Sequence, residues 1–266
     1  MSAIDTLFQS LRAEGRKALM PFLTAGDPDL QFPMDVIHWL AAVGCHLFEL
    51  GIPYSDPIAD GPVIQASYTR SLERKTKLAD ILAALGQATP KLSAPVVTMV
   101  SYAIVFRHGI ERYVADARAA GAAGIIVPDL PVDEAGPLAE VCRREDFSLI
   151  QLVTPLTPHD RALRIAERTT GFIYYVSVAG ITGERTVLPP EIVDNVGWLR
   201  EHTPLPICIG FGISRPDHIR LLKPVADGLI VGSAFVRRMA EAATKPRQQV
   251  LDEIAAYAQQ LLAATI

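Results

Sequence analysis

Eight short apolar runs recur along the 266-residue chain, and a longer stretch with helical periodicity separates each run from the next. Apolar residues are mostly continuous within the runs and do not alternate with polar ones. Strands of a parallel sheet have this pattern because helices cover both faces of the sheet. The predicted strands are Ala18–Gly26, His46–Ile52, Ala94–Tyr102, Gly124–Leu130, Ser148–Pro155, Gly171–Val178, Leu205–Ile213 and Gly228–Val236.

The stretches between these runs predict amphipathic helices. Asp29–Gly44, for example, places Val36, Ile37 and Leu40 on one face of a helix. The other helices predicted between or after the strands are Ile110–Gly121, Glu134–Asp146, His159–Thr170, Pro189–Thr203, Arg215–Pro224 and Pro246–Ala264.

Repetition of strand and helix indicates βα units, and eight such units favour a closed (β/α)8 barrel, the TIM-barrel fold, over an open doubly wound sheet. The length is close to the roughly 250 residues typical of this α/β fold. Two additional helices are predicted, Ile4–Glu14 before the first strand and Leu78–Leu85 after the second. Because no linker or change of composition divides the chain, we expect residues 1–266 to form one barrel domain.

Charge and cysteine content limit the classes of function. The 25 basic and 29 acidic side chains give a formal net charge of −4, and no Lys or Arg cluster could follow a phosphate backbone, so we expect no nucleic-acid partner. Cys45, Cys142 and Cys208 are far apart and odd in number, which predicts reduced thiols. No stretch approaches the roughly 18 apolar residues of a membrane span, and no signal-peptide pattern opens the chain, so we expect a soluble, cytoplasmic protein.

Glycine-rich turns follow the last three predicted strands, at Gly180–Gly183, Gly210–Ser214 and Gly232–Ser233. Glycine lets the backbone approach an anion closely, and Ser or Thr hydroxyls add hydrogen-bond donors. A single glycine after a strand is most often a plain turn. Three such turns at consecutive strand ends of one barrel predict a phosphate-binding cup, because barrel active sites lie on these loops.

Glu49 lies within the second apolar run, near its end. Burial of a charged carboxylate is costly, so the pKa of this glutamate should rise, which suits a group that gives and takes protons. An ion pair with a nearby Arg or Lys is the structural alternative, and position alone does not separate the two interpretations.

The loop that follows, residues 53–62, offers two further carboxylates. Asp56 precedes a proline and could form an Asx-turn, whereas Asp60 precedes Gly-Pro and could N-cap the next helix. Capping is the commoner role of a single loop aspartate. Asp27, in a Gly-Asp-Pro turn, is interpreted in the same way, as a turn or cap residue.

Other chemistries find little support in the sequence. The six histidines are scattered, without ligand spacing, so no metal site and no cofactor are expected. The predicted strands contain no lysine for a Schiff base, and no GxSxG motif is present.

Several segments together resemble the alpha subunit of tryptophan synthase. They are Pro21–Pro28, Phe48–Gln65, Val127–Pro131, Gly180–Gly183 and Gly210–Ser214. The resemblance extends over essentially the whole chain, and the second segment, which is long and ungapped, is the most specific.

The resemblance implies retro-aldol cleavage of indole-3-glycerol phosphate to indole and glyceraldehyde 3-phosphate, in partnership with a beta subunit in a heterotetramer. It implies that Glu49 is the acid/base glutamate and Asp60 the catalytic aspartate. The residues that match positions around the indole and the glycerol chain are Phe22, Ile64, Tyr174, Thr182 and Phe211, with Thr182 on the loop after the sixth strand. The residues that match the phosphate cup are Gly183, Gly212, Gly232 and Ser233.

The chain departs from the family pattern after the third strand. Members commonly read Met-Thr-Tyr-Tyr-Asn-Pro where Met99–Ile104 reads Met-Val-Ser-Tyr-Ala-Ile, and Val178 replaces an arginine of some members. Pro53 and Asp56, which match positions facing the beta subunit, are retained. The departure leaves the two catalytic positions intact and affects contacts with the partner.

Four hypotheses follow: a lyase working as a tryptophan synthase alpha subunit, a stand-alone lyase that releases free indole, a subunit kept mainly to activate a beta partner, and another phosphate-binding barrel such as a sugar-phosphate isomerase. Retention of Glu49 and Asp60 argues against the third hypothesis. The fourth does not explain the Asp56–Asp60 loop. The first is the leading prediction.

Overall fold

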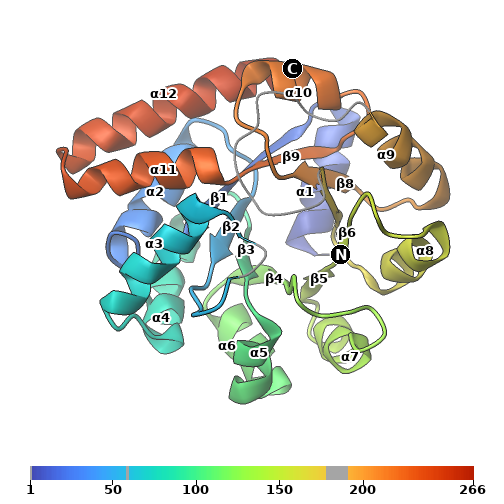
Figure 1. Ribbon diagram of the computed structural model, residues 1–266, viewed down its shortest axis with the longest axis horizontal. Coiled ribbons are helices and arrows are strands. Elements are labelled where there is room, and N and C mark those ends of the chain that lie inside the picture. Colours follow the sequence, from blue (N-terminus) through green and yellow to red (C-terminus); the bar gives the residue numbers. More distant parts are fainter. Residues whose placement is uncertain (1, 58–59, 178–190) are drawn as a thin grey trace.

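The computed structural model describes residues 2–57, 60–177 and 191–266. In these residues nine parallel strands lie in the order β5-β4-β3-β2-β1-β9-β8-β7-β6, and Figure 1 shows the helices in a ring around them. The strands are β1 (Ala18–Thr24), β2 (Phe48–Gly51), β3 (Val96–Met99), β4 (Ala122–Ile126), β5 (Ser148–Ile150), β6 (Leu152–Val153), β7 (Ile173–Val176), β8 (Ile207–Gly210) and β9 (Gly228–Val231).

The two ends of this order, β5 and β6, are consecutive pieces of one strand. β5 pairs with β4, and after Gln151 the chain continues as β6, which pairs with β7. The backbone carbonyl of Gln151 accepts a hydrogen bond from the N–H of Tyr174 (3.0 Å), so the pairing with β7 already begins between the two pieces. The prediction of a barrel built from eight strand segments is thereby confirmed, with the fifth segment in two pieces.

The predicted strands were too long at several ends. The third was expected to continue to Tyr102, but β3 ends at Met99 and a helix begins at Tyr102. The eighth was expected to continue to Val236, but β9 ends at Val231 and a helix begins at Ser233. Apolar residues continue past both strand ends because the helices that follow are buried on one side, so hydrophobicity alone does not mark the boundary.

The helices surround the strands and alternate with them. They are α1 (Ala3–Ala13), α2 (Gln31–Ala42), α3 (Pro62–Glu73), α4 (Leu78–Ala88), α5 (Tyr102–His108), α6 (Ile110–Ala119), α7 (Gly136–Arg144), α8 (His159–Arg168), α9 (Glu191–His202), α10 (Pro216–Leu222), α11 (Ser233–Ala240) and α12 (Arg247–Thr265), with 3-10 turns η1 (Thr89–Lys91) and η2 (Glu241–Ala243). The extra helices before the first strand and after the second are confirmed as α1 and α4, whereas α5 was not predicted.

One apolar cluster fills the barrel and its amino-terminal end. Met20, Val97, Ile126 and Cys208 point inward from four strands. The N-terminal helix adds Ile4, Phe8 and Leu11 to the same cluster, and the Phe8 ring lies 5.9 Å from that of Phe172, just before β7. α1 therefore covers the amino-terminal end, which leaves the opposite, carboxyl-terminal end for a site.

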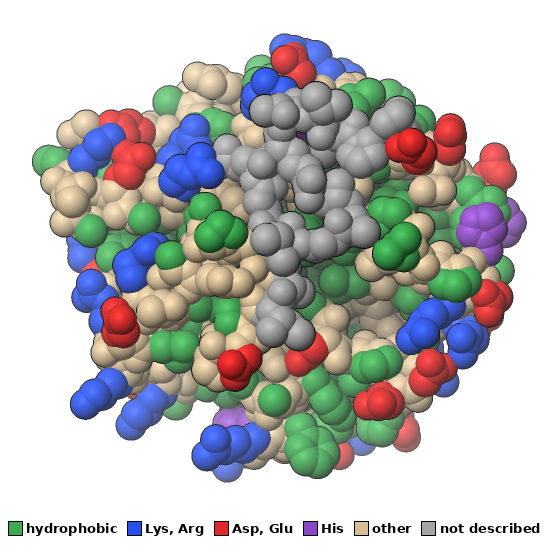
Figure 2. Space-filling view, in the orientation of Figure 1, with side chains coloured by type: hydrophobic (Ala, Val, Ile, Leu, Met, Phe, Trp, Pro, Cys, Tyr) green, Lys and Arg blue, Asp and Glu red, His purple; other side chains and the backbone are tan. Residues whose placement is uncertain are grey.

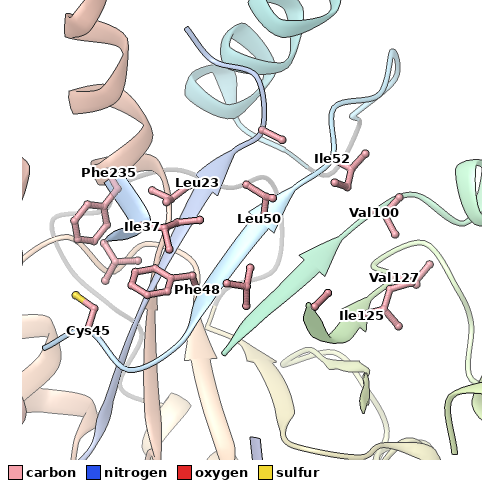
Figure 3. Packing of buried hydrophobic residues seen from close by; sticks show 14 of the residues in the cluster. Leu23, Ile37, Cys45, Phe48, Leu50, Ile52, Val100, Ile125, Val127 and Phe235 are labelled. Carbon is pink, nitrogen blue, oxygen red and sulfur yellow. The ribbon is translucent and has the colours of Figure 1, made fainter. Parts of the chain in front are cut away.

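A second, larger cluster lies between the strands and the outer helices. Side chains of adjacent strand residues point to opposite faces, so Phe48 and Leu50 of β2 point outward while Glu49 points inward. Figure 3 shows Leu23 and Phe48 beside Ile37 of α2, with Phe235 of α11 nearby. This layer fixes the strands in register and so positions their carboxyl ends.

Within the described residues, no helix is both long enough and apolar enough to cross a membrane.

Candidate active site

A pocket opens at the carboxyl-terminal end of the barrel, where a TIM barrel carries its chemistry. It encloses about 460 Å³ of space, part of it open to solvent. Its lining comes from β1, α3, β3, β7 and β9 and from the loops that follow β2, β8 and β9: Phe22, Asp60, Ile64, Met99, Tyr174, Phe211, Gly212, Ile213, Ile230, Gly232 and Ser233.

Eight of the expected site residues lie together around this pocket. They are Phe22, Asp60, Ile64, Tyr174, Phe211, Gly212, Gly232 and Ser233. Glu49 lies beside the pocket and is considered below. Thr182 and Gly183, the two remaining residues, fall outside the described part of the chain.

One side of the pocket is built from backbone. Phe211 and Gly212 after β8 have positive φ angles of 73° and 77°, and the Ser177 hydroxyl donates a hydrogen bond to the carbonyl of Phe211. Gly232 is the N-cap of α11 without a side-chain cap, and Ser233 begins the helix. The first N–H groups of a helix lack carbonyl partners and carry partial positive charge, so this side of the pocket suits an anion such as phosphate.

The other side of the pocket is apolar and aromatic. Phe22 and Ile64 belong to one buried cluster, and the Tyr174 ring lies edge-on to the ring of Phe211, with centroids 6.1 Å apart. Gly210 makes room for Tyr174, since a β-carbon at Gly210 would lie 2.3 Å from the tyrosine hydroxyl. A flat aromatic group would fit here while an anionic group occupies the backbone side.

Glu49 lies in β2 beside Phe22 of β1, with which it is in register. Its side chain is fully buried, and neither carboxyl oxygen has a hydrogen-bond partner among the described residues. Burial raises the pKa of this carboxyl well above its usual range. An ion pair with Arg or Lys, the structural alternative, is therefore not found in the described residues.

Asp60 lies at the pocket edge, half-buried, just before α3. The capping interpretation is wrong, because Gly61 is the N-cap of α3 and no side chain caps that helix. The loop is held by its backbone: the N–H of Asp60 donates to the carbonyl of Pro57 (3.0 Å), and Gln65 Nε2 donates to the carbonyl of Asp60 (2.7 Å). The Asp60 carboxylate is thus directed by the loop and lines the pocket.

Asp27 lies in a bend after β1, in agreement with the turn interpretation, but its side chain does not cap the helix that follows. Its carboxylate is fully buried and accepts two hydrogen bonds from Arg70 of α3, at 2.8 Å from Nε and 2.7 Å from the second nitrogen. The residues are 43 positions apart, so no local pattern indicates the pair. Asp56 is exposed and accepts a hydrogen bond from the Ser55 hydroxyl (2.8 Å).

Three lining residues were not predicted as site residues, namely Met99, Ile213 and Ile230. Met99 ends β3, and Ile213 follows the glycine turn after β8, so position at a carboxyl strand end was the available signal for both. Ile230 lies inside β9, where alternation of inward and outward residues was the signal. No group of three or more His, Cys, Asp or Glu side chains in the described ranges is placed to hold a metal ion.

Comparison with known proteins places this geometry in a family. Residues 8–265 match the family model described as "Tryptophan synthase alpha chain". The chain is 56% identical to the tryptophan synthase alpha chain of Rhodopirellula baltica over 264 residues, which cover 98% of this chain and 95% of the relative. The chain belongs to the tryptophan synthase alpha chain family.

Solved structures agree with this family membership. Tryptophan synthase subunit alpha from Legionella pneumophila superposes with a TM-score of 0.90 at 32% identity, over 100% of this chain and 98% of that one. A chain of Mycobacterium tuberculosis tryptophan synthase gives a TM-score of 0.89 at 31% identity, over 99% and 98% of the two chains. The resemblance inferred from sequence is confirmed, and the chain is a lyase of tryptophan biosynthesis.

Proposed function

We propose that this chain cleaves indole-3-glycerol phosphate as the alpha subunit of a tryptophan synthase, with Glu49 and Asp60 as its catalytic residues. The observation that carries the proposal is a fully buried glutamate, without a hydrogen-bond partner in the part of the chain that the structure describes. It lies beside a pocket with one side suited to an anion and one aromatic side. Such a pocket matches a substrate with a phosphate at one end and an indole ring at the other.

The proposed reaction is a retro-aldol cleavage. Glu49 donates a proton to indole C3, and the positive charge that appears on the ring nitrogen is stabilised by the Asp60 carboxylate next to the ring N–H. Glu49, now a carboxylate, takes the proton of the hydroxyl on the adjacent glycerol carbon. The O–H electrons form the aldehyde, the C3–carbon bond breaks, and its electron pair restores the aromatic indole.

Burial of Glu49 supports the first step of this sequence. A carboxyl group with an ordinary pKa would be ionised near neutral pH and would have no proton to give. The raised pKa of Glu49 keeps the proton on the acid until the substrate accepts it. A different proton, taken from the glycerol hydroxyl, restores the acid form of Glu49 for the next turnover.

At the phosphate end, the proposal places the substrate phosphate on Gly212, Gly232 and Ser233, against the first turn of α11. Thr182 and Gly183 are included in the proposal because they match family positions, although they lie outside the described residues. Binding at this end fixes the distance from the phosphate to the reacting carbon and so orients the indole over Glu49.

The partner is a tryptophan synthase beta subunit. Tyr54, Asp56, Ser101, Arg107 and Asp129 line a groove beside the active-site loop, and Asp56 at its edge is exposed. The departure from the family pattern has a structural role in this groove. The Ser101 hydroxyl donates to Asp129 Oδ2 (2.7 Å), and the N–H of Tyr102 donates to Oδ1 (2.8 Å), which fixes the start of α5.

A cytoplasmic location is part of the same proposal. It is supported by the biosynthetic family and by the three free, buried cysteines, which suit a reducing compartment.

The test is release of indole from indole-3-glycerol phosphate by the purified chain, alone and with a beta subunit. Glu49→Gln should lower kcat by at least the 10²–10⁴-fold that general acid–base groups typically supply, while a phosphate-containing product analogue still binds. Glu14→Gln, an exposed glutamate on the opposite side of the barrel, is the matched control. No indole under either condition would contradict the proposal, and full activity without a beta subunit would favour a stand-alone lyase.

A further inference from the structure

Tyr68 of α3 is a buried tyrosine directly behind the pocket wall. It is 2% exposed and shares a cluster with Phe22 and Ile64, both of which line the pocket. The ring of Tyr54, from the loop before α3, lies 5.5 Å from its own. Tyr68 itself does not line the pocket, so it is placed to act on the residues of the site and not on the substrate.

The Tyr68 hydroxyl lies close to Gly51, which has no side chain and so leaves room for it. A β-carbon on Gly51 would lie 2.8 Å from that hydroxyl oxygen and 2.4 Å from the ring edge of Phe22. Gly51 and Glu49 are two residues apart in β2, so their β-carbons point to the same face of the strand. The hydroxyl therefore lies on the inner face of β2, one position nearer the mouth of the barrel than Glu49.

Neither carboxyl oxygen of Glu49 has a hydrogen-bond partner among the described residues. Tyr68 is also within electrostatic range of both carboxylates. Burial, followed by the charges of Asp60, Tyr54 and Glu49, raises the pKa of the phenol well above its usual range, so the group keeps its proton and remains a donor.

Other titratable groups face Glu49 from β7 and β8. Burial and then the charge of Glu49 raise the pKa of Tyr174, and burial, Asp227 and Glu49 raise that of Cys208. Both groups therefore stay neutral near physiological pH. Asp60 also contributes to the raised pKa of both Tyr68 and Tyr174.

We propose that the Tyr68 hydroxyl is a positioning group for Glu49, donating a hydrogen bond, directly or through one water, to the Glu49 carboxylate once the glutamate has lost its proton. This inference rests on the proposed function. In the cycle, Glu49 becomes charged after it has protonated C3. A neutral donor near Glu49 stabilises this carboxylate without competing for the proton.

The expected effect of Tyr68→Phe follows from the loss of this donor. The Glu49 carboxylate is then less stable, so Glu49 holds its proton to a higher pH. The alkaline limb of the kcat profile, which reports loss of the Glu49 proton, should move upward by about 0.5 to 1 pH unit, because one hydrogen bond to a charged group is lost. A tyrosine with a packing role alone would change kcat without moving this limb.

The matched control is Tyr113→Phe. Tyr113 is a fully buried tyrosine in the outer layer whose hydroxyl donates to Thr98 (3.1 Å), so its removal costs a buried hydrogen bond away from the carboxylates. Tyr113→Phe should leave the alkaline limb where the parent has it. An unmoved alkaline limb in Tyr68→Phe, or the same movement in Tyr113→Phe, would overturn the proposal.

A second readout does not need lyase activity. The Glu49 carboxyl signal in ¹³C-glutamate-labelled protein, assigned by its absence in Glu49→Gln, should titrate at a higher pH in Tyr68→Phe than in the parent. If the parent releases no indole, the proposed function fails while this titration still tests Tyr68. If the parent is active and the titration is the same in both proteins, the inference about Tyr68 fails alone.

Discussion

Each end of the barrel buries a carboxyl group, and the two groups differ in whether hydrogen-bond donors surround them. At the amino-terminal end, Asp227 is 4% exposed, and its oxygens accept hydrogen bonds from Arg12 of α1 (3.2 Å at both) and from the N–H of Ile207 (3.0 Å). At the carboxyl-terminal end, Glu49 is fully buried and has no partner among the described residues. One carboxylate is paired with an arginine, whereas burial raises the pKa of the other and favours its acid form.

The difference shows how one barrel separates stability from chemistry. A buried carboxylate with a full set of donors ties the N-terminal helix to the strands, whereas a buried carboxylate without donors costs stability and gains a raised pKa. Asp27 follows the first pattern although it lies near the mouth, because its partner Arg70 ties α3 to the loop after β1. Pairing with arginine therefore distinguishes structural carboxylates from Glu49.

The largest effects are expected when each of the two buried acids is replaced by its amide, Asp227→Asn at the amino-terminal end of the barrel and Glu49→Gln at the carboxyl-terminal end. Asp227→Asn removes the charge that Arg12 binds, and it should lower the free energy of unfolding by about 2–3 kcal/mol, because hydrogen bonds to a charged group are lost at a buried site. Partial exposure of Arg12 (45%) keeps the cost below that of a fully buried pair. Urea denaturation measures the change, and kcat should stay near that of the parent.

Glu49→Gln is the counterpart of this experiment. It exchanges a buried carboxyl group for an amide of the same shape. At a pH below the unfolded-state pKa of the glutamate, the free energy of unfolding should therefore change by less than about 1 kcal/mol, while turnover is lost. A strongly destabilised Glu49→Gln would show that the glutamate has a structural partner. An inactive but stable Asp227→Asn would contradict the assignment of stability to the amino-terminal end of the barrel and of catalysis to the carboxyl-terminal end.

The next effect is a difference in the pH dependence of stability. The pKa of Glu49 is raised in the folded state, so as pH rises above its unfolded value the unfolded chain loses this proton first and folding becomes less favourable. The loss continues until the folded-state pKa is passed. Glu49→Gln should remove this contribution, so the stability of the variant relative to the parent should increase as pH rises above the unfolded-state pKa of the glutamate.

Thermal unfolding of both proteins at several pH values measures this difference. Asp227→Asn, compared with the parent over the same range, should not show the gain. A constant difference between Glu49→Gln and the parent across the range would mean that Glu49 titrates alike in the folded and unfolded chains.

The fold was largely predictable because the strands and helices of a parallel barrel have recognisable patterns of apolar residues in the sequence. Apolar runs covered on both sides and helices with one apolar face identified the βα units, including the extra helices α1 and α4. Boundaries were less predictable: Tyr102 continues an apolar run but begins α5, since its N–H meets the carboxylate of Asp129, 27 residues away. Such a contact has no local signal.

In the candidate site, too, some residues have a local sequence signal and others depend on contacts between distant segments. Glycine turns at strand ends predicted the phosphate side of the pocket. The family resemblance, and not the residue pattern, indicated its aromatic side and the functional interpretation of Glu49 and Asp60. The pairing of Asp27 with Arg70 and the position of Tyr68 could not be predicted, because both depend on how α3 packs against β1 and β2. Residues that act through packing between distant segments are recognised once the segments are placed.

The smallest expected effect lies outside both ends of the barrel, at Gly197 in the middle of α9. A β-carbon there would meet no atom within 4 Å, whereas one at Gly210 in the pocket would meet Tyr174. Gly197→Ala should therefore stabilise the chain by about 0.5–1 kcal/mol, since alanine loses less conformational freedom in a helix than glycine, and it should leave kcat unchanged. Urea denaturation and the indole assay check the two expectations. A destabilised Gly197→Ala would mean that α9 contacts a part of the chain beyond the described residues, and a change in kcat would extend the functional region from the mouth of the barrel into its outer layer.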